Sequence, residues 1–419
     1  MSTPAWIRMG SGCPRTRAAG LALLAWLLWL VPFAAQARPP CELDRAAGSP
    51  ELRRCLQIEQ GIQANLDGHL DRADAIWTQL IAEDSRDPVP RLWQVDTALW
   101  RLVLNEGETA SDDLILAQTD AVIRLANAAL KNRGDDAEAL YRKGTSLIQR
   151  ARLNGVRGHY LAAARDGERG RELLERALVL RPDDTEIKYP LGLYSYYVSV
   201  APRILKWVSW LWFVPKGDRA LGLAYLQDVE RSEGAHATDA SFILTNIHTY
   251  HAPLDLTAAL QSSRVLHARH PDNALFHSEL IEVLVKIGLY DEAIEAALAL
   301  ESSHPEAAEA KVRPQLARIL RAQAILLDGR ADEAWAVLEP MDAETSELPS
   351  WGGAWLNLVR GQIHDARGDR SLALAEYRRV VKLKGVAYNR RAALIAEAGL
   401  ETPFEPAAYR ELPMISAGP

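Results

Sequence analysis

The stretch GQIHDARGDRSLALAEYRRVV, residues 361–381, sets out a structural unit that can be traced through most of the chain. Gly361, Gly368, Ala373 and Tyr377 stand at fixed intervals in it, and helix-forming residues lie between them. Gly368 can adopt the positive φ of a tight turn, and the small residues at 361 and 373 allow two helix backbones to approach closely. The stretch therefore predicts an antiparallel pair of helices joined by a glycine turn.

The same spacing recurs along the chain. Near the front, Gly61, Gly68, Ala73 and Trp77 occupy the four corresponding positions. Three further segments repeat the pattern: 241–271 loosely, 275–305 with the turn GLYDEA, and 316–341 with the turn GRADEA. A single pair of this kind cannot bury its apolar face alone, whereas stacked pairs can. The repeats predict an all-α solenoid.

Two units depart from the minimal length. The partner of the helix predicted over 140–152 ends before Pro182, so we expect it to start about 14 residues later than a minimal unit allows. In the next unit, GDRALGLAYL at 217–226 is a near copy of GDRSLALAEY at 368–377. The aromatic segment before it is thus predicted to be an insertion, about 196–216, between the two helices of one repeat. We count about eight helix pairs and then a capping helix over 388–398.

The units from Arg54 to Gly385 resemble the tetratricopeptide repeat (TPR) family. That resemblance implies a right-handed superhelical α-solenoid whose first helices line a concave groove for a protein or peptide partner. The positions that line the groove in the family correspond here to Tyr189, Leu193, Tyr196, Tyr197, Leu244, His248, His251, Ser278, Glu282, Lys286, Gln323, Trp355, Gln362 and Asp365. Among these, the residues that we predict to bind a partner are Tyr189, Tyr196, Tyr197, His248, His251 and Trp355.

The predicted insertion contains Trp207, Trp210 and Trp212, which we add to the predicted partner-binding residues. Three interpretations of this insertion stay open. It is a part of the core, a wedge that binds a partner, or a segment at a membrane interface with its tryptophan rings at headgroup depth. Pro202 and Lys206 interrupt the apolar run, which argues against a full membrane span.

A narrower resemblance covers the same region. The segment SVAPRILKWVSWLWFVPKGDRALGLAYL, residues 199–226, is similar to the central region of the eukaryotic tetratricopeptide repeat protein 39 family. The matching residues are Pro202, Ile204, Leu205, Lys206, Gly217, Asp218, Arg219, Gly222 and Leu223. That family is intracellular, so the export signal of this chain is a departure from it. The interpretation we favour is a bacterial secreted relative.

The N-terminus has the order of a secretory signal. Arg8, Arg15 and Arg17 precede an apolar run over 18–35, and Ala35 and Ala37 are small residues at a cleavage site. We therefore predict a signal peptide over 1–37, an entry segment over 38–53, the solenoid over 54–400 and an irregular tail over 401–419. An uncleaved membrane anchor is the alternative for the first segment. The expected location is periplasmic or secreted, in a Gram-negative bacterium.

Two of the three cysteines, Cys41 and Cys55, follow the predicted cleavage site. In an exported chain they are expected to form a disulfide that closes a loop of about 15 residues and stabilises the fold by about 3 kcal/mol. Unpaired thiols are the alternative. The bridge would fasten the entry segment to the first helix.

Composition and motifs favour a binding protein over an enzyme. The net charge of -7 offers no basic surface for nucleic acid. No nucleophile elbow and no P-loop is present, and no cofactor is implied. His248 and His251 are spaced for one helix face and could bind a metal, but a structural role is the more common one for such a pair. We predict a non-catalytic exported scaffold, with peripheral membrane association through the tryptophans as the alternative.

Overall fold

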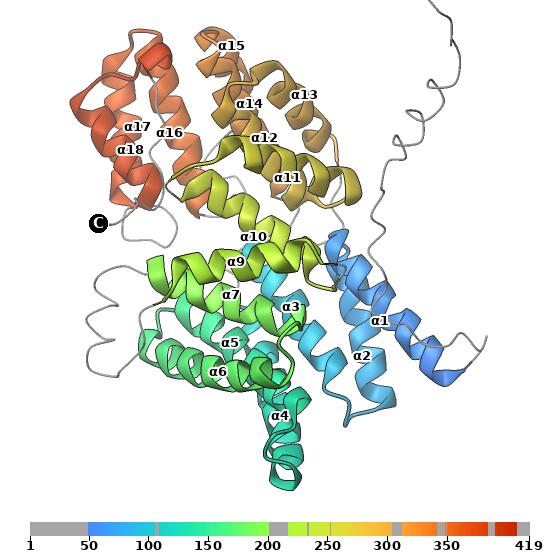
Figure 1. The fold of residues 1–419 in the computed structure, drawn as a ribbon. Helices are drawn as coiled ribbons and strands as arrows, with labels where there is room; N and C mark the ends of the chain where they lie inside the picture. The colour runs from blue at the N-terminus through green and yellow to red at the C-terminus, as the bar shows by residue number, and fades with distance from the viewer. Residues whose placement is uncertain are drawn as a thin grey trace, which may run out of the picture. The chain divides into compact units, whose positions relative to one another are not determined.

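The computed structural model describes residues 49–104, 109–200, 217–232, 234–251, 253–303, 312–341, 348, 350–383 and 390–408. Within these residues the regular structure is helical, without strands, and eight helix pairs follow one another (Figure 1). The first helices are α1 (Pro50–Leu66), α3 (Val89–Leu104), α5 (Ala137–Val156), α7 (Thr185–Val200), α10 (Ala237–Tyr250), α12 (Ala274–Ile287), α14 (Arg313–Leu327) and α16 (Ser350–Ala366). The second helices are α2 (Leu70–Glu83), α4 (Asp112–Asn132), α6 (Tyr160–Leu180), α9 (Arg219–Glu230), α11 (Leu256–Arg269), α13 (Tyr290–Glu301), α15 (Ala331–Leu338) and α17 (Arg370–Lys382).

One more helix, α18 (Arg390–Glu401), packs on α16 and α17, and a short 3₁₀ turn, η2 (Pro406–Ala408), follows it. Each second helix contacts its own first helix and the first helix of the next pair. The chain is therefore an all-α solenoid of TPR-like helix pairs closed by a capping helix, which confirms the predicted fold class.

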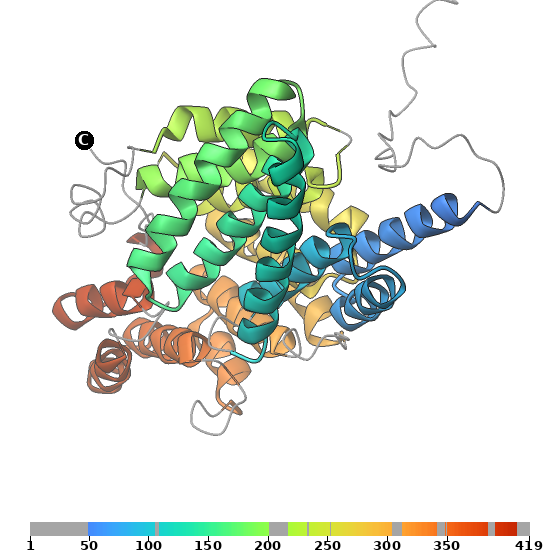
Figure 2. The ribbon, with the colours of Figure 1, turned by 90° about the horizontal axis from the view of Figure 1, so that it is seen from below.

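Glycines with positive φ make the turns inside several pairs. Gly68, Gly288, Gly329 and Gly368 have φ between 81° and 87°, as their places in the sequence pattern predicted. Gly158, with φ 77°, makes a fifth such turn, between α5 and α6. The second helix of this unit does start late, but by less than predicted. Tyr160 follows Gly144 by 16 residues, whereas Leu70 follows Gly61 by 9, so the delay is 7 residues and not about 14. The first helix, α5, takes up the delay, because it runs on to Val156. In two views, α4, α5 and α6 lie side by side (Figures 1 and 2).

Small residues at the helix crossings allow large partners to pack directly on the backbone. A Cβ added at Gly61 would lie 2.5 Å from Cζ2 of Trp77, a fully buried ring whose Nε1 donates to Thr97 Oγ1 at 3.0 Å. In the longer pair, a Cβ at Gly144 would lie 2.6 Å from Cγ of Leu174. A larger residue at either glycine would push two helices apart.

The pair α7 and α9 is joined by residues 201–216. A Cβ at Gly222 would lie 2.6 Å from the backbone nitrogen of Tyr196, and one at Gly217 would lie 2.6 Å from the carbonyl oxygen of Ser195. The chain therefore returns to the end of α7 before α9 starts, so residues 201–216 connect the two helices of one pair. Helix α7 extends to Val200, which places Tyr196 and Tyr197 in the helix and not in the connection.

The second pair also packs on pairs that are distant in sequence. Trp100 of α3 lies 5.1 Å from Phe242 of α10 and 5.8 Å from Phe276 of α12, measured between ring centroids. Asn273, the N-cap of α12, donates from Nδ2 to the carbonyl oxygen of Leu66 at 2.8 Å. These contacts join early and middle pairs into one core cluster and bury α3 on most of its faces.

Candidate functional site

Aromatic and charged side chains from four helices meet around the ring of Tyr250, at the end of α10. The Nζ of Lys286, on α12, lies 4.9 Å from the centroid of this ring. The Cζ of Arg391, on α18, lies 5.3 Å from it and 5.5 Å from the ring of Trp355, on α16. The Tyr250 hydroxyl donates to Oε2 of Glu282. All five side chains are partly exposed, so solvent reaches the place where these helices meet.

A buried carboxyl group lies beside these residues. Glu279, on α12, is 8% exposed, and its Oε2 has no hydrogen-bond partner among the described residues. The guanidinium of Arg313, on α14, donates to Ser278 Oγ and to the carbonyl oxygen of Leu104, each at 3.3 Å, and lies 5.9 Å from the ring of Trp351. We refer to Tyr250, Glu279, Glu282, Lys286, Trp355 and Arg391 as the Tyr250 cluster.

Burial changes the protonation of two groups in the Tyr250 cluster. It raises the pKa of Glu279 to about 8, and the negative charge of Glu282 adds to this effect while Arg313 and Lys286 oppose it. The carboxylic acid form of Glu279 therefore predominates at pH 7. Burial also lowers the pKa of Lys286, and the positive charge of Arg391 lowers it further. The Tyr250 cluster thus places two basic side chains at one ring, where burial disfavours the charged form of Lys286.

A second group of charges surrounds the buried ring of His236 and joins three helix pairs. The imidazole of His236 lies between the rings of Trp93, at 4.9 Å, and Tyr189, at 4.4 Å. Its Nδ1 donates to Asp239 at 3.0 Å, and its Nε2 lies 3.6 Å from Glu186. His236 is 8% exposed. Because His236 contacts two rings and two carboxylates, it holds α3, α7 and α10 together.

The charges around His236 favour its protonated form. Burial opposes the charge, but Glu186, the hydrogen bond to Asp239 and nearby Asp96 outweigh it and raise the pKa of His236 to about 9. Burial, with the negative charge of Asp239, raises the pKa of Asp96 to about 7, against the opposing effect of His236.

The predicted partner-binding residues divide into buried and accessible ones. Tyr189, Tyr196 and His251 are 8%, 0% and 7% exposed and have little surface to offer a partner. The Tyr196 hydroxyl bonds to Nδ1 of His251 at 2.7 Å, and the two rings stack. Tyr197 is 42% exposed, and Trp355 is partly exposed in the Tyr250 cluster. Tyr189, Tyr196 and His251 therefore pack against neighbouring helices and do not face an open groove.

The histidine pairs differ from the predicted arrangement. His248 lies in the last turn of α10, whereas His251 has left the helix, with extended φ and ψ, so the two do not share a helix face. Burial, with the positive charge of Arg219, lowers the pKa of His251 to about 4. The ring centroids of His267 and His277 lie 4.1 Å apart, and the two rings are tilted by 31°. In the part of the chain that the structure describes, no group of three His, Cys, Asp or Glu side chains is placed to hold a metal ion.

Several predicted features lie outside the described residues. These are Trp207, Trp210 and Trp212, the signal segment over 1–37, and Cys41. Cys55, in α1, is disulfide-bonded, and its pairing with Cys41 stays a prediction. Among the described helices, none is both long and apolar enough for a membrane span.

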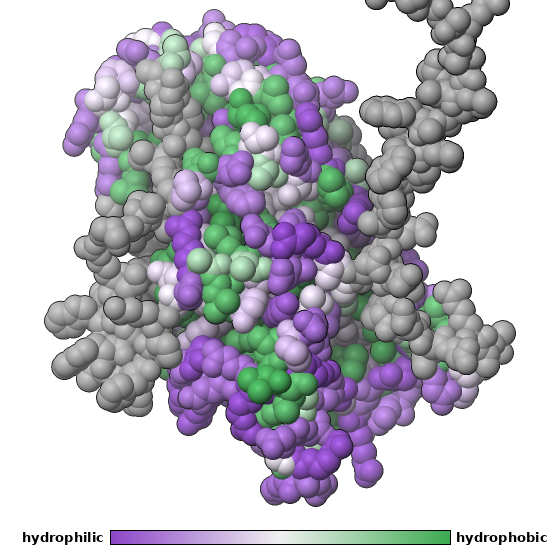
Figure 3. Space-filling view, viewed as in Figure 1, coloured by the Kyte–Doolittle hydropathy of each residue, from purple (hydrophilic) through white to green (hydrophobic). Residues whose placement is uncertain are grey.

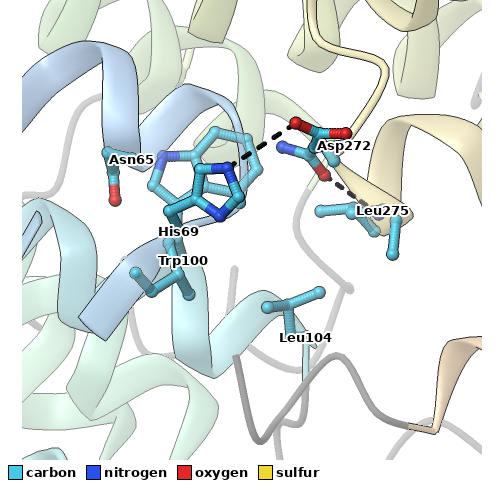
Figure 4. Close-up of a pocket in the computed structure, with 10 residues that line it drawn as sticks. Asn65, His69, Trp100, Leu104, Asp272 and Leu275 are labelled. Carbon is cyan, nitrogen blue, oxygen red and sulfur yellow. Dashed lines mark hydrogen bonds and ion pairs between the residues drawn. The ribbon is translucent and has the colours of Figure 1, made fainter. Parts of the chain in front are cut away.

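A small pocket between α2 and α12 is a poor candidate for a ligand site. Figure 4 shows its lining, in which His69 and Asp272 face each other at 3.7 Å and Trp100 and Leu104 close the other side. The space between these side chains suits a water molecule and no larger ligand. An exposed apolar patch lies over the end of α6, where Val179 and Leu180 are 81% and 47% exposed (Figure 3).

Three members of the Tyr250 cluster, namely Tyr250, Glu279 and Arg391, have no counterpart among the residues predicted to line the groove. Tyr250 lies next to predicted positions at the end of its helix, and Arg391 belongs to the capping helix. Glu282, Lys286 and Trp355 were predicted groove positions, and the structure brings them to Tyr250 and Arg391. An aromatic residue beside a groove position was a signal that could have identified Tyr250, whereas Arg391 offered none.

No protein-family model and no curated protein matches the chain. Among solved structures, the chain is similar to a tetratricopeptide repeat protein from Parabacteroides merdae. The two are 14% identical, the match covers 83% of this chain and 99% of the other, and the TM-score is 0.29. This match is too distant to support an argument, and the fold assignment rests on the helix pairs themselves.

Proposed function

We propose that this chain is an exported, non-catalytic scaffold that binds a protein or peptide segment through the Tyr250 cluster. The observation that supports this most directly is the meeting of Tyr250, Lys286, Trp355 and Arg391 from four helices with part of each side chain still exposed. Aromatic and arginine side chains are the residues that dominate protein interfaces. A stack of helix pairs holds them in place before a partner arrives, which lowers the entropic cost of binding.

The export part of the proposal rests on the charged, apolar and small-residue segments over 1–37. Residues 199–226 support a relationship to the tetratricopeptide repeat protein 39 family, in a bacterial secreted form. Trp207, Trp210 and Trp212 would extend the binding surface beyond the Tyr250 cluster.

Cross-linking in a periplasmic extract tests the proposal. The protein purified from the periplasm is compared with a Lys286→Gln, Arg391→Gln double variant. A matched control, Arg379→Gln with Lys382→Gln, removes the same charges from the outer helix α17, where Arg379 is exposed and pairs with Glu376. We expect a specific adduct that the first variant loses and the control keeps. Equal adducts in all three proteins, with equal helical content by circular dichroism, would contradict binding at this cluster.

A further inference from the structure

A short segment of the chain lies across two neighbouring first helices near the end of the solenoid. We refer to residues 402–408, which follow α18 and end in η2, as the strap. The backbone N–H of Phe404 donates to Oδ2 of Asp365, in α16, at 2.8 Å, and η2 contacts α14. The strap therefore runs from the capping helix over α16 to α14, and it bonds to Asp365, a residue that was predicted to line the groove.

The strap has the conformation of a bound peptide. Residues 403–405 form no helix, and the exposed side chains of Pro403 and Glu405 alternate with the partly buried ones of Phe404 and Pro406. Such alternation is typical of an extended segment that lies on a surface. Phe404 packs against the core cluster that α14, α15 and α16 form. A backbone hydrogen bond, together with every second side chain packed inward, is a common way to hold an extended peptide.

Asp365 is held in place by residues outside the strap. Its side chain is buried, and Nη1 of Arg370 donates to its two carboxylate oxygens at 3.0 and 2.9 Å. The hydroxyl of Tyr377 donates to Oδ2 at 2.9 Å. Both donors belong to α17, so the carboxylate keeps its orientation when the strap leaves. It then presents an oriented acceptor for the backbone N–H of another segment, which lowers the entropic cost of binding.

Few side chains of the strap hold it on the solenoid. Those of Phe404 and Pro406 are partly buried, whereas those at positions 402, 403, 405 and 407 are exposed. Nη2 of Arg370 donates to the carbonyl oxygen of Leu400 at 3.0 Å, which fixes the end of α18 ahead of the strap. The strap can therefore open while α18 stays folded, and a segment with so few buried contacts opens at low cost.

We propose that the strap occupies a peptide site on α14 and α16, from which an extended partner segment carrying an aromatic residue displaces it. The partner's ring would take the place of Phe404, and its backbone N–H would bond to Asp365. This proposal rests on the proposed function, and it names the partner segment and a restraint on its binding. Trp355, of the Tyr250 cluster, packs against the same core cluster as Phe404, so one partner can reach both places. Because the strap belongs to the same chain, its effective concentration at the site is high, and a partner must compete with it.

Binding of a copy of the strap to the full exported protein tests this proposal. The probe is the fluorescein-labelled, C-terminally amidated peptide TPFEPAA, which repeats residues 402–408, and fluorescence anisotropy follows its binding. Phe404→Ala loosens the strap, so we expect this variant to bind the peptide at least about tenfold tighter than the native protein does. The same peptide with alanine in place of phenylalanine should bind to the variant at least about tenfold more weakly.

Two further variants of the strap control for the substitution. Glu405 is exposed, so Glu405→Gln should leave the strap closed and the peptide affinity equal to that of the native protein. Pro406→Ser loosens the strap at its other partly buried residue and should tighten peptide binding about threefold. Circular dichroism checks that each variant keeps the native helical content. The proposal is overturned by equal peptide affinities of the native protein and Phe404→Ala, by equal affinities of the two peptides, or by no saturable binding to the folded variants.

Cross-linking in the periplasmic extract separates this proposal from the proposed function. If the strap restrains the partner, the yield of the partner adduct should rise at least about threefold in Phe404→Ala and stay unchanged in Glu405→Gln. An adduct that depends on Lys286 and Arg391 but forms equally in native protein and Phe404→Ala, while the peptide fails to bind, would leave the proposed function standing and refute the displacement of the strap alone.

Discussion

Replacement of His236 by glutamine should remove a pH-dependent part of the stability. The folded protein raises the pKa of His236 from 6.5 to about 9, so the folded state binds a proton more tightly than the unfolded state does. The resulting stabilisation is fully present below pH 6.5 and is lost as the pH rises through 9. Glutamine can still bond to Asp239 but cannot take up the proton.

The magnitude follows from these two pKa values. One pKa unit corresponds to about 1.4 kcal/mol, which gives a stabilisation of ~3 kcal/mol at pH 6, ~2 kcal/mol at pH 7.5 and ~0.4 kcal/mol at pH 9. Urea unfolding followed by circular dichroism at these three pH values measures the difference between native protein and variant. We expect that difference to shrink steadily as the pH rises.

His159→Gln is the matched control, because His159 is exposed at the start of α6. Its unfolding free energy should follow that of the native protein at each pH. The reasoning would be refuted if His236→Gln lowered stability by the same amount at pH 6 and pH 9, since a loss of packing alone has no such pH dependence.

Three further predictions concern packing and membrane contact. Asn273→Ala removes the N-cap of α12 and leaves the buried carbonyl of Leu66 without its donor, so we expect a loss of about 2–4 kcal/mol in urea unfolding. Asn273→Asp keeps the cap acceptor but also lacks the donor, so it should not recover the native stability. Gly61→Ala forces a methyl group against Trp77 and should cost about 1–3 kcal/mol, while Gly134→Ala, where no atom lies within 4 Å of the added Cβ, should change the melting temperature little. In vesicle flotation, we expect the exported protein to stay in the soluble fraction with neutral and with anionic lipids; co-flotation would favour the membrane alternative.

The repeating part of the fold was predictable because each unit specifies its own turn. Gly68, Gly288, Gly329 and Gly368 stand where two helices must reverse, and each adopts the positive φ that this requires. Gly158 was missed because the helices on either side of it are longer than the standard unit. Its turn, Gly-His followed by an aromatic residue, resembles Gly68-His69-Leu70 closely enough to have been a signal.

The contacts between distant pairs could not be predicted from the sequence. Trp100 contacts Phe242 and Phe276 because each helix pair is rotated relative to the one before it. The residue pattern inside a single repeat does not specify the angle of that rotation. For the same reason, Tyr196 was predicted to face a partner but is buried against His251. Long-range packing decided which groove positions stay accessible.

Site-specific photo-cross-linking is the most direct test of partner binding at the Tyr250 cluster. A photoreactive phenylalanine derivative replaces Trp355 in one protein and, as a control, the exposed Leu372 of the outer helix α17 in another. After illumination in the periplasm, we predict a protein adduct at position 355 and none at position 372. Adducts of equal yield at both positions, or an adduct at 372 alone, would contradict binding through this cluster.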